Sequence, residues 1–194
     1  MRGDPRAELA SGRRTMRHLY SPTPGEFLVG AELERREFRV YLPTKDSGID
    51  LLAARDEHHL AVQVKESRTY PQPARSAVDW TSWTQLGPGD LGRAQELGVD
   101  FFVFVVHVPD VSGARPRFLP LYIVIAPGEL ERRLAAYRPS ADRAVYWYQS
   151  EDRQLWEVRG RRSEAGPPFR VAERNFTSHL NAWGLLEQAS ESPL

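Results

Sequence analysis

The stretch SGIDLLAARDEHHLAVQVKES, residues 47–67, decides how this chain folds. Apolar residues dominate on both sides of the charged segment DEHH at 56–59, which is typical of a hairpin turn. Polar side chains nevertheless interrupt both runs, because Asp50 begins the first and Gln63 and Lys65 lie within the second. The stretch therefore predicts a β-hairpin that carries an acid, an amide and an amine among its core residues.

The spacing of these polar residues indicates which of them lie together, because side chains alternate between the two faces of a strand. In the predicted strand 59–66, Gln63 and Lys65 share one face, while Asp50 belongs to the predicted strand 49–55. If the two polar faces coincide, the three side chains meet at one end of the hairpin. Buried charges are unfavourable unless they are paired or bind a cation. The carboxylate and the amide oxygen are ligands that suit Mg²⁺.

The helix expected before the hairpin contributes a second carboxylate. The segment GEFLVGAELERREF, residues 25–38, has apolar residues at helical spacing. Glu26 shares its stripe with Val29 and Leu33, the side that packs on a sheet. An acid on this stripe is predicted to point toward the hairpin.

Lysine usage singles out one member of this group. Lys45 and Lys65 are the only lysines among the 26 basic residues, and all the others are arginines. A lysine ammonium is a compact point charge, whereas a guanidinium is a planar fork. The lysine at position 65 therefore indicates contact with a water or a phosphate that arginine does not reproduce.

The rest of the chain predicts an α/β fold. Further strands are expected at 38–43, 100–108 and 120–126, helices at 88–98, 128–137 and 175–188, a hairpin across 144–160, and a long loop with little regular structure at 67–88. The run 100–108 is almost continuously apolar, so we expect a strand buried on both faces. The order predicts a mixed central sheet flanked by helices, with C-terminal additions.

Composition sets further limits. The 194 residues suit one domain, which we divide into a flexible basic arm (1–22), a core (23–138), and a C-terminal hairpin and helix packed on it (139–194). Neither a membrane span nor a signal peptide is recognisable, and cysteine is absent, so a cytoplasmic location is expected. The formal net charge is zero, so any nucleic-acid contact must come from local patches.

In this order, GE at 25–26, GID at 48–50 and QVK at 63–65 resemble the PD-(D/E)XK nuclease superfamily. The resemblance is to the branch that has Gln for the second acid, found in some homing endonucleases and Mrr-related families. The Glu-bearing helix is similar to that of Holliday-junction resolvases. The likeness covers about residues 24–126 and implies a restriction-endonuclease-like αβββαβ core. It departs from the pattern at Ile49, where the family has Pro, and at Gln63.

The resemblance implies a metal-dependent endonuclease that hydrolyses phosphodiester bonds in DNA, with a place in restriction, defence or mobile-element biology. It implies catalytic roles for Glu26, Asp50, Gln63 and Lys65. Glu26, Asp50, Gln63 and the Val64 carbonyl would hold Mg²⁺, or Mn²⁺ in its place. Lys65 would orient the attacking water or neutralise charge on the phosphate. RNA as the substrate and a homodimer as the assembly stay open.

Five residues near the motif are candidates for nucleic-acid binding: Lys45, Arg68, Arg75, Trp80 and Trp83. The alternative for the two tryptophans is a cap on the core. Two other functions stay open as well. One is a nuclease-fold module that has lost cleavage and binds nucleic acid or a protein, which the neutral Gln63 and the zero net charge favour. The other is a structural or assembly protein.

Overall fold

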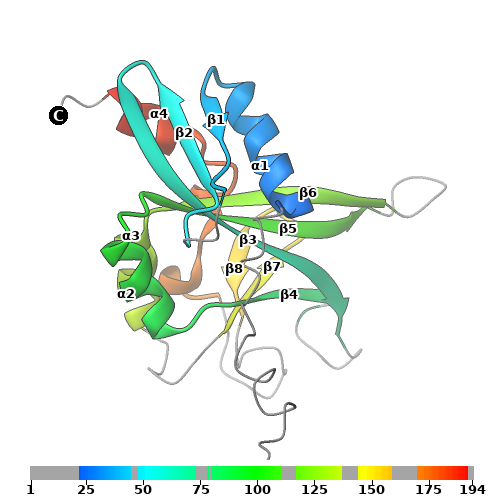
Figure 1. The fold of residues 1–194 in the computed structure, drawn as a ribbon. Coiled ribbons are helices and arrows are strands. Elements are labelled where there is room, and N and C mark those ends of the chain that lie inside the picture. The colour runs from blue at the N-terminus through cyan, green and yellow to red at the C-terminus, as the bar shows by residue number, and fades with distance from the viewer. Residues whose placement is uncertain are drawn as a thin grey trace, which may run out of the picture.

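The computed structural model of the chain describes residues 22–44, 48–72, 78, 80–110, 117–136, 144–158 and 170–191. The helices are α1 (Pro24–Glu34), α2 (Pro88–Glu96), α3 (Pro127–Ala135) and α4 (Gly184–Glu191), with 3-10 turns η2 (Ala172–Arg174) and η3 (Thr177–His179). The strands are β1 (Arg39–Tyr41), β2 (Leu51–Arg55), β3 (His58–Pro71), β4 (Trp80–Gln85), β5 (Phe101–Asp110), β6 (Arg117–Ile125), β7 (Ala144–Gln149) and β8 (Leu155–Glu157). Figure 1 shows them as one mixed sheet with helices packed around it. None of the described helices is long and apolar enough to cross a membrane.

Strand β3 organises the sheet, because its partners change along its length. Residues 58–62 pair antiparallel with β2, and residues 69–71 pair antiparallel with β4 on the same edge. On the other edge, residues 62–68 pair with the parallel strand β5. The sheet extends through β1 beyond β2, through β6 beyond β5, and through β7 and β8 beyond β4.

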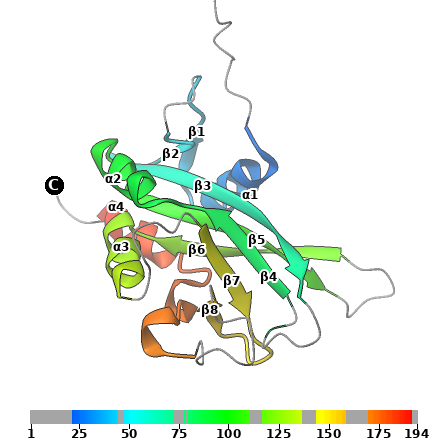
Figure 2. The ribbon, with the colours of Figure 1, turned by 90° about the horizontal axis from the view of Figure 1, so that it is seen from below.

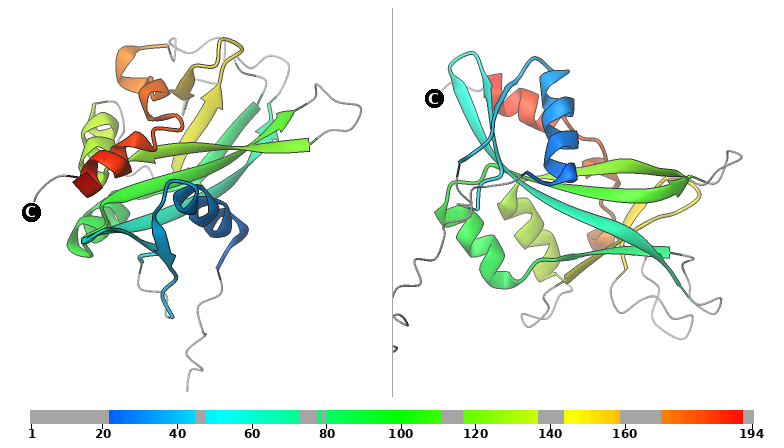
Figure 3. Two further views of the ribbon diagram at one scale, coloured as in Figure 1. Left: turned by 90° about the horizontal axis from the view of Figure 1, so that it is seen from above. Right: turned by 45° about the vertical axis from the view of Figure 1, so that its right-hand side comes forward.

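The two strands on the shared edge of β3 do not meet. The pairing with β2 ends at Leu51↔Val62, and the pairing with β4 begins at Thr69↔Ser82. Among the described residues no strand pairs with this edge in between, and the right-hand view of Figure 3 shows β2 and β4 diverging from β3. We call this edge, residues 63–68 of β3, the β3 fork.

Two apolar layers sandwich the sheet. Helices α1 and α4 pack on one face, with Val29, Leu33, Val103, Trp183 and Leu186 in one buried cluster. Helices α2 and α3 pack on the other face, with Leu91, Phe102, Phe104, Leu130 and Phe176 in a second cluster. Figure 1 shows α1 and α4 above β5 and α2 and α3 below it, and Figure 2, seen from below, shows β4, β7 and β8 side by side. The apolar run of β5 is continuous because its alternate residues enter different clusters. Burial of each of these side chains contributes about 1.5–3 kcal/mol to the stability of the fold.

The structure confirms the α/β class and the mixed sheet. The predicted αβββαβ order is present as α1, β1, β2, β3, α2 and β5, with the additional strand β4 between β3 and α2. It also confirms the opening hairpin, whose turn is Asp56–Glu57. Strand β7 pairs with β4, so the C-terminal hairpin belongs to the same sheet. The proposed basic arm lies outside the described residues except for its last position, Pro22.

The prediction of a long loop at 67–88 is wrong. Strand β3 continues to Pro71, and β4 occupies Trp80–Gln85. These segments are polar, but their buried hydroxyls satisfy one another: Ser67 bonds Ser82, and Thr84 donates to Ser67. A hydroxyl ladder of this kind supports strand pairing without apolar residues.

The prediction of one helix over 175–188 is also wrong. The turn η3 is followed by Leu180, which forms a β-bridge with Ile123 of β6, and by Asn181, whose φ is 52°. The Asn181 N–H donates to the Tyr122 carbonyl at 2.7 Å. The segment therefore attaches to the sheet before α4 begins, which breaks the helical repeat.

Candidate functional site at the β3 fork

Asp50 lies at the upper end of the β3 fork, just before β2. Its N–H donates to the Val62 carbonyl at 3.0 Å, and its Oδ2 accepts the Val64 N–H at 2.7 Å. Gly48 precedes it with φ of 87°, and a Cβ there would lie 2.8 Å from Leu97 Cδ1. The glycine thus lets the chain turn tightly, so that the Asp50 carboxylate rests against the backbone of β3.

The main chain of Val64 completes this edge. The N–H and C=O of a strand residue point to the same edge of the strand. Since the Val64 N–H points to Asp50, the Val64 carbonyl also faces the fork. A carboxylate and a main-chain carbonyl therefore face the same gap in the sheet.

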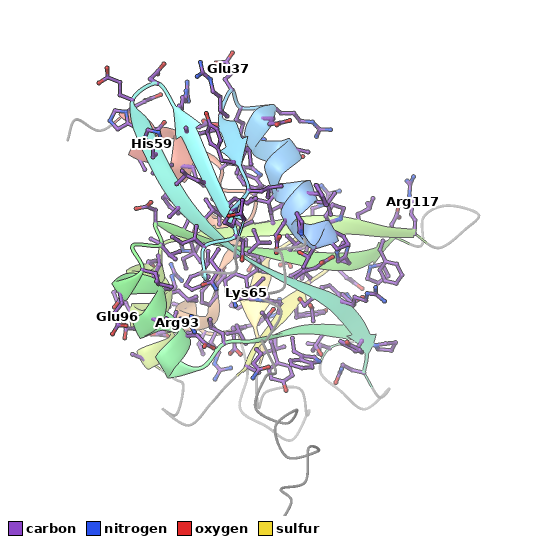
Figure 4. All side chains as sticks on the ribbon, in the orientation of Figure 1. Glu37, His59, Lys65, Arg93, Glu96 and Arg117 are labelled. Carbon is purple, nitrogen blue, oxygen red and sulfur yellow. The ribbon has the colours of Figure 1, made fainter. Side chains whose placement is uncertain are left out.

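Gln63 and Lys65 project toward α2. They line a cavity of 190 Å³ together with Gly48 and four residues of the α2 region, namely Asp90, Arg93, Ala94 and Leu97. Figure 4 shows Lys65 on β3 and Arg93 on α2 at this side of the sheet. Within the described part of the chain, the side chains of Gln63, Lys65 and Arg93 form no hydrogen bond or ion pair. Asp90 accepts the Gly87 N–H at 2.7 Å.

Glu26 approaches from the opposite face. It lies in the first turn of α1 and is 5% exposed. It forms a capping box with Thr23, in which its Oε2 accepts the Thr23 N–H at 3.1 Å and its own N–H donates to Thr23 Oγ1. The preceding Gly25 donates its N–H to Glu66 Oε2 at 3.1 Å. The first turn of α1 is thereby fixed against the residue that follows Lys65.

Three of the four sequence-predicted catalytic residues therefore lie along residues 62–65 of β3, whereas the Glu26 carboxylate caps its own helix α1 and the neighbouring Gly25 bonds to β3, at Glu66. Asp50 lies at the edge, Gln63 and Lys65 lie on the face toward α2, and Glu26 comes from the face toward α1. The roles assigned to these side chains stay predictions.

Sequence reasoning missed Glu66, Asp90 and Arg93. Glu66 shares the face of Val62 and Val64, and its Oε1 lies 2.7 Å from His107 Nε2 of β5. Because side chains alternate along a strand, the sequence could have shown that Glu66 puts a carboxylate on the otherwise apolar face of β3 beneath α1. Asp90 and Arg93 gave no local signal, because only the packing of α2 brings them to Lys65.

The candidates for nucleic-acid binding separate into three groups. Arg68 and Trp83 line one groove of 460 Å³ beside the fork. Trp80 is half-buried and packs on Tyr148, with ring centroids 5.4 Å apart. Lys45 and Arg75 lie outside the described residues.

A metal at the fork would need neutral oxygen ligands. No group of three His, Cys, Asp or Glu side chains in the described ranges is arranged to hold a metal ion. The available donors near Asp50 are the Gln63 amide oxygen and the Val64 carbonyl, with Glu26 on the α1 side. This set consists entirely of hard oxygens, which fits Mg²⁺ or Mn²⁺ better than zinc.

The sequence matches no protein-family model and no curated protein. The fold is similar to the solved structure of the bacterial homing endonuclease I-Ssp6803I, with a TM-score of 0.48 and 14% sequence identity. The similarity covers 85% of this chain and 88% of that chain. A likeness this weak does not establish a shared family.

Proposed function

We propose that this chain is a metal-dependent endonuclease that hydrolyses phosphodiester bonds in DNA. The observation that supports it most is the Asp50 carboxylate, held by the Val64 amide in a gap of the sheet. Lys65, whose ammonium has no partner among the described residues, follows Val64 directly. The acid can bind a cation and the unpaired amine can bind an anion. Because both lie beside the same stretch of strand, they suit a cation and an anion bound together.

The donor set would hold Mg²⁺ or Mn²⁺ through Asp50, the Gln63 amide oxygen, the Val64 carbonyl and Glu26. When bound, such an ion lowers the pKa of a water molecule and polarises the phosphate. Gln63 contributes no charge, so the site carries less negative charge than one with three acids. We therefore expect a weak metal affinity that depends strongly on the phosphate of the substrate.

The chain's own residues would supply the electrostatic part of the reaction. Water attacks the phosphorus, one P–O bond breaks, and negative charge grows on the phosphate oxygens in the transition state. The Lys65 ammonium would stabilise that charge and orient the attacking water. Arg93 lines the same cavity and would contact an adjacent phosphate. No covalent intermediate with the protein is formed.

The biological context belongs to the same proposal. The resemblance in the motif residues supports DNA as the substrate and a role in restriction, defence or mobile-element biology. A homodimer would allow two sites to cut both strands of a duplex.

A DNA-binding module without cleavage is the second candidate. Gln63 stands where an acid is usual, and no three acids or histidines of the described residues form a metal cluster. Either feature would leave the fork able to bind phosphate but not to activate water.

The test is cleavage of supercoiled plasmid and of labelled single-stranded, duplex and branched DNA, with Mg²⁺ or Mn²⁺ titrated into the full chain. We expect metal-dependent cutting that Asp50→Asn, Lys65→Met and Glu26→Gln abolish. Glu57→Gln, at the exposed turn of the same hairpin, is the matched control and keeps full activity. Cutting that survives all three site variants contradicts the proposal, and binding without cutting favours the module. If the chain neither cuts nor binds DNA, a structural role is the remaining explanation.

A further inference from the structure

A groove begins where the β3 fork ends. It has a volume of 460 Å³ and runs between the second half of β3 and β4. Its lining residues are Pro24, Glu66, Ser67, Arg68, Tyr70, Trp83, Thr84 and Gln85. We call it the β3–β4 groove. Pro24 lies two residues before Glu26, and Glu66 follows Lys65, so the groove opens directly beside the candidate site.

Two aromatic rings and a guanidinium share one side of this groove. The pairs Tyr70↔Thr81 and Thr69↔Ser82 set a register that, continued by one step, puts Arg68 opposite Trp83. Directly opposed residues of antiparallel strands project on the same face, and Tyr70 is on the face of Arg68. Tyr70 is 48% exposed and Trp83 is 44% exposed. Among the described residues neither ring packs on another aromatic, and Arg68 forms no ion pair.

The walls of the groove are fixed before any ligand arrives. The hydroxyls of Ser67, Ser82 and Thr84 bond one another in the interior, which holds β3 and β4 together. Glu66 is held at both carboxylate oxygens, by the Gly25 N–H and by His107 Nε2. Exposed aromatic faces on a rigid concave surface bind flat ligands without the entropy loss of ordering a loop.

We propose that the β3–β4 groove binds unpaired bases of single-stranded DNA, which stack on Trp83 and Tyr70 while Arg68 contacts the sugar–phosphate backbone. The choice of DNA as the ligand rests on the proposed function. Every base has a π-face, so stacking on aromatic rings is tolerant of sequence, and arginine adds a cationic contact. Glu66 lies in the groove but is engaged by Gly25 and His107, so its charge is partly compensated.

The position of the groove gives this binding a consequence for the substrate. A duplex keeps its base faces inside its own stack and cannot offer them to Trp83 and Tyr70. A nucleotide stacked in the groove would place the neighbouring phosphate at the fork, on the edge of β3 that Asp50 contacts. The substrate is therefore DNA with a single-stranded segment, such as a flap, a gap or a branch, cut next to the unpaired bases.

The first experiment measures binding of the full chain without metal, in EDTA, by fluorescence anisotropy. The probes are a fluorescein-labelled single strand of mixed sequence, its duplex, and a single strand with abasic residues in place of the bases. We expect the single strand to bind more tightly than the other two. Trp83→Ala and Tyr70→Ala each weaken single-strand binding about 5- to 150-fold, the range for loss of one stacked base.

Phe118→Ala is the matched control, because Phe118 is an exposed aromatic residue on β6 that does not line the groove. It leaves binding unchanged. A second measurement separates stacking from charge attraction. Fluorescence of 2-aminopurine in the single strand is quenched by the wild-type chain and by Arg68→Ala at saturation, but not by Trp83→Ala.

Equal binding of the normal and the abasic strand, or a preference for the duplex, overturns the groove proposal. So does self-association of the chain that Trp83→Ala abolishes, because the groove would then be an interface between copies. If Asp50→Asn abolishes cutting while Trp83→Ala leaves single-strand binding intact, the groove proposal fails and the nuclease function stands. If binding depends on Trp83 but no metal supports cutting, the groove proposal stands alone.

Discussion

Lys65 of β3 and Arg93 of α2 line the same cavity of 190 Å³. A guanidinium is larger and planar, so it does not place its charge where the compact ammonium does. We expect Lys65→Arg to lower the cleavage rate at least about 100-fold although the charge is kept, since a displaced donor forfeits transition-state stabilisation. Plasmid cleavage under single-turnover conditions measures it. A rate near wild type would mean that charge alone matters at this position.

The turn before Asp50 depends on Gly48. Its φ of 87° is strained for a residue with a side chain, and a Cβ there would lie 2.8 Å from Leu97 Cδ1, so the end of the Leu97 side chain would also have to shift. We expect Gly48→Ala to lower the free energy of unfolding by about 1–3 kcal/mol, measured by urea titration. Gly92→Ala in α2 is the control, because a Cβ there meets no atom within 4 Å, and it is expected to stabilise by about 0.5–1 kcal/mol. An equal effect of the two variants would contradict the strained turn.

At the level of elements, helix α3 is fixed by a carboxylate with two arginine partners. Glu129 accepts hydrogen bonds from Arg132 and from Arg133 Nε at 2.7 Å, and the bond from Arg132, more than any other contact, lowers the pKa of Glu129 to about 2. The ordinary pKa of 4.5 lies above this, so the unfolded chain binds the proton more tightly. The stability from Glu129 is complete above pH 4.5 and is lost as the pH falls toward 2.

We therefore expect Glu129→Gln to lower the free energy of unfolding at neutral pH by about 0.5–1 kcal/mol, the upper range of exposed ion pairs. The difference from wild type shrinks as the pH falls through this window, because the wild-type carboxylate becomes neutral as well. Thermal unfolding at several pH values measures it. The control is Glu34→Gln on α1, whose side chain has no ion pair among the described residues. A difference that is constant from pH 7 to pH 2 would contradict the ionic origin.

The elements that the sequence predicts well are those with one apolar pattern over most of their length. Helix α1 buries residues at helical spacing, β2 is buried or half-buried throughout, and β5 is buried continuously from Phe101 to Val106. Strand β4 escaped prediction because its buried residues are Thr81, Ser82 and Thr84, whose hydroxyls become satisfied only across strands. The segment before α4 escaped it because a bridge from Leu180 to β6 interrupts the pattern. Pairings between segments that are distant in the chain do not change the residue pattern within a short stretch of sequence, so this pattern does not predict them.

At the level of the whole molecule, the candidate site exists because β3 changes partners. The sequence predicted Asp50, Gln63 and Lys65 from alternation along two neighbouring strands, which is a local property. It predicted Glu26 on an inward stripe, and the structure buries this residue. The fork itself depends on β4 pairing with β3, and the cavity depends on α2 crossing that face. Both are consequences of long-range topology, so Arg93 and the β3–β4 groove were not predictable from residue order.

The same topology predicts that the molecule unfolds as one unit. Strands β7 and β8 extend the sheet beyond β4, and Arg174 donates to Glu157 of β8 at 3.0 Å, with side chains 6% and 2% exposed. Loss of one partner leaves a buried charge, so Arg174→Met is expected to lower the free energy of unfolding by about 3–5 kcal/mol. Arg174→Met with Glu157→Leu removes both charges and recovers most of it. Because β7 pairs with β4 and β4 with β3, circular dichroism and tryptophan fluorescence are expected to report the same urea transition. In Arg174→Met this transition shifts as a whole to lower urea concentration. Two separate transitions, with strands β1, β2 and β3 unaffected by Arg174→Met, would show instead that the C-terminal hairpin unfolds independently of the core.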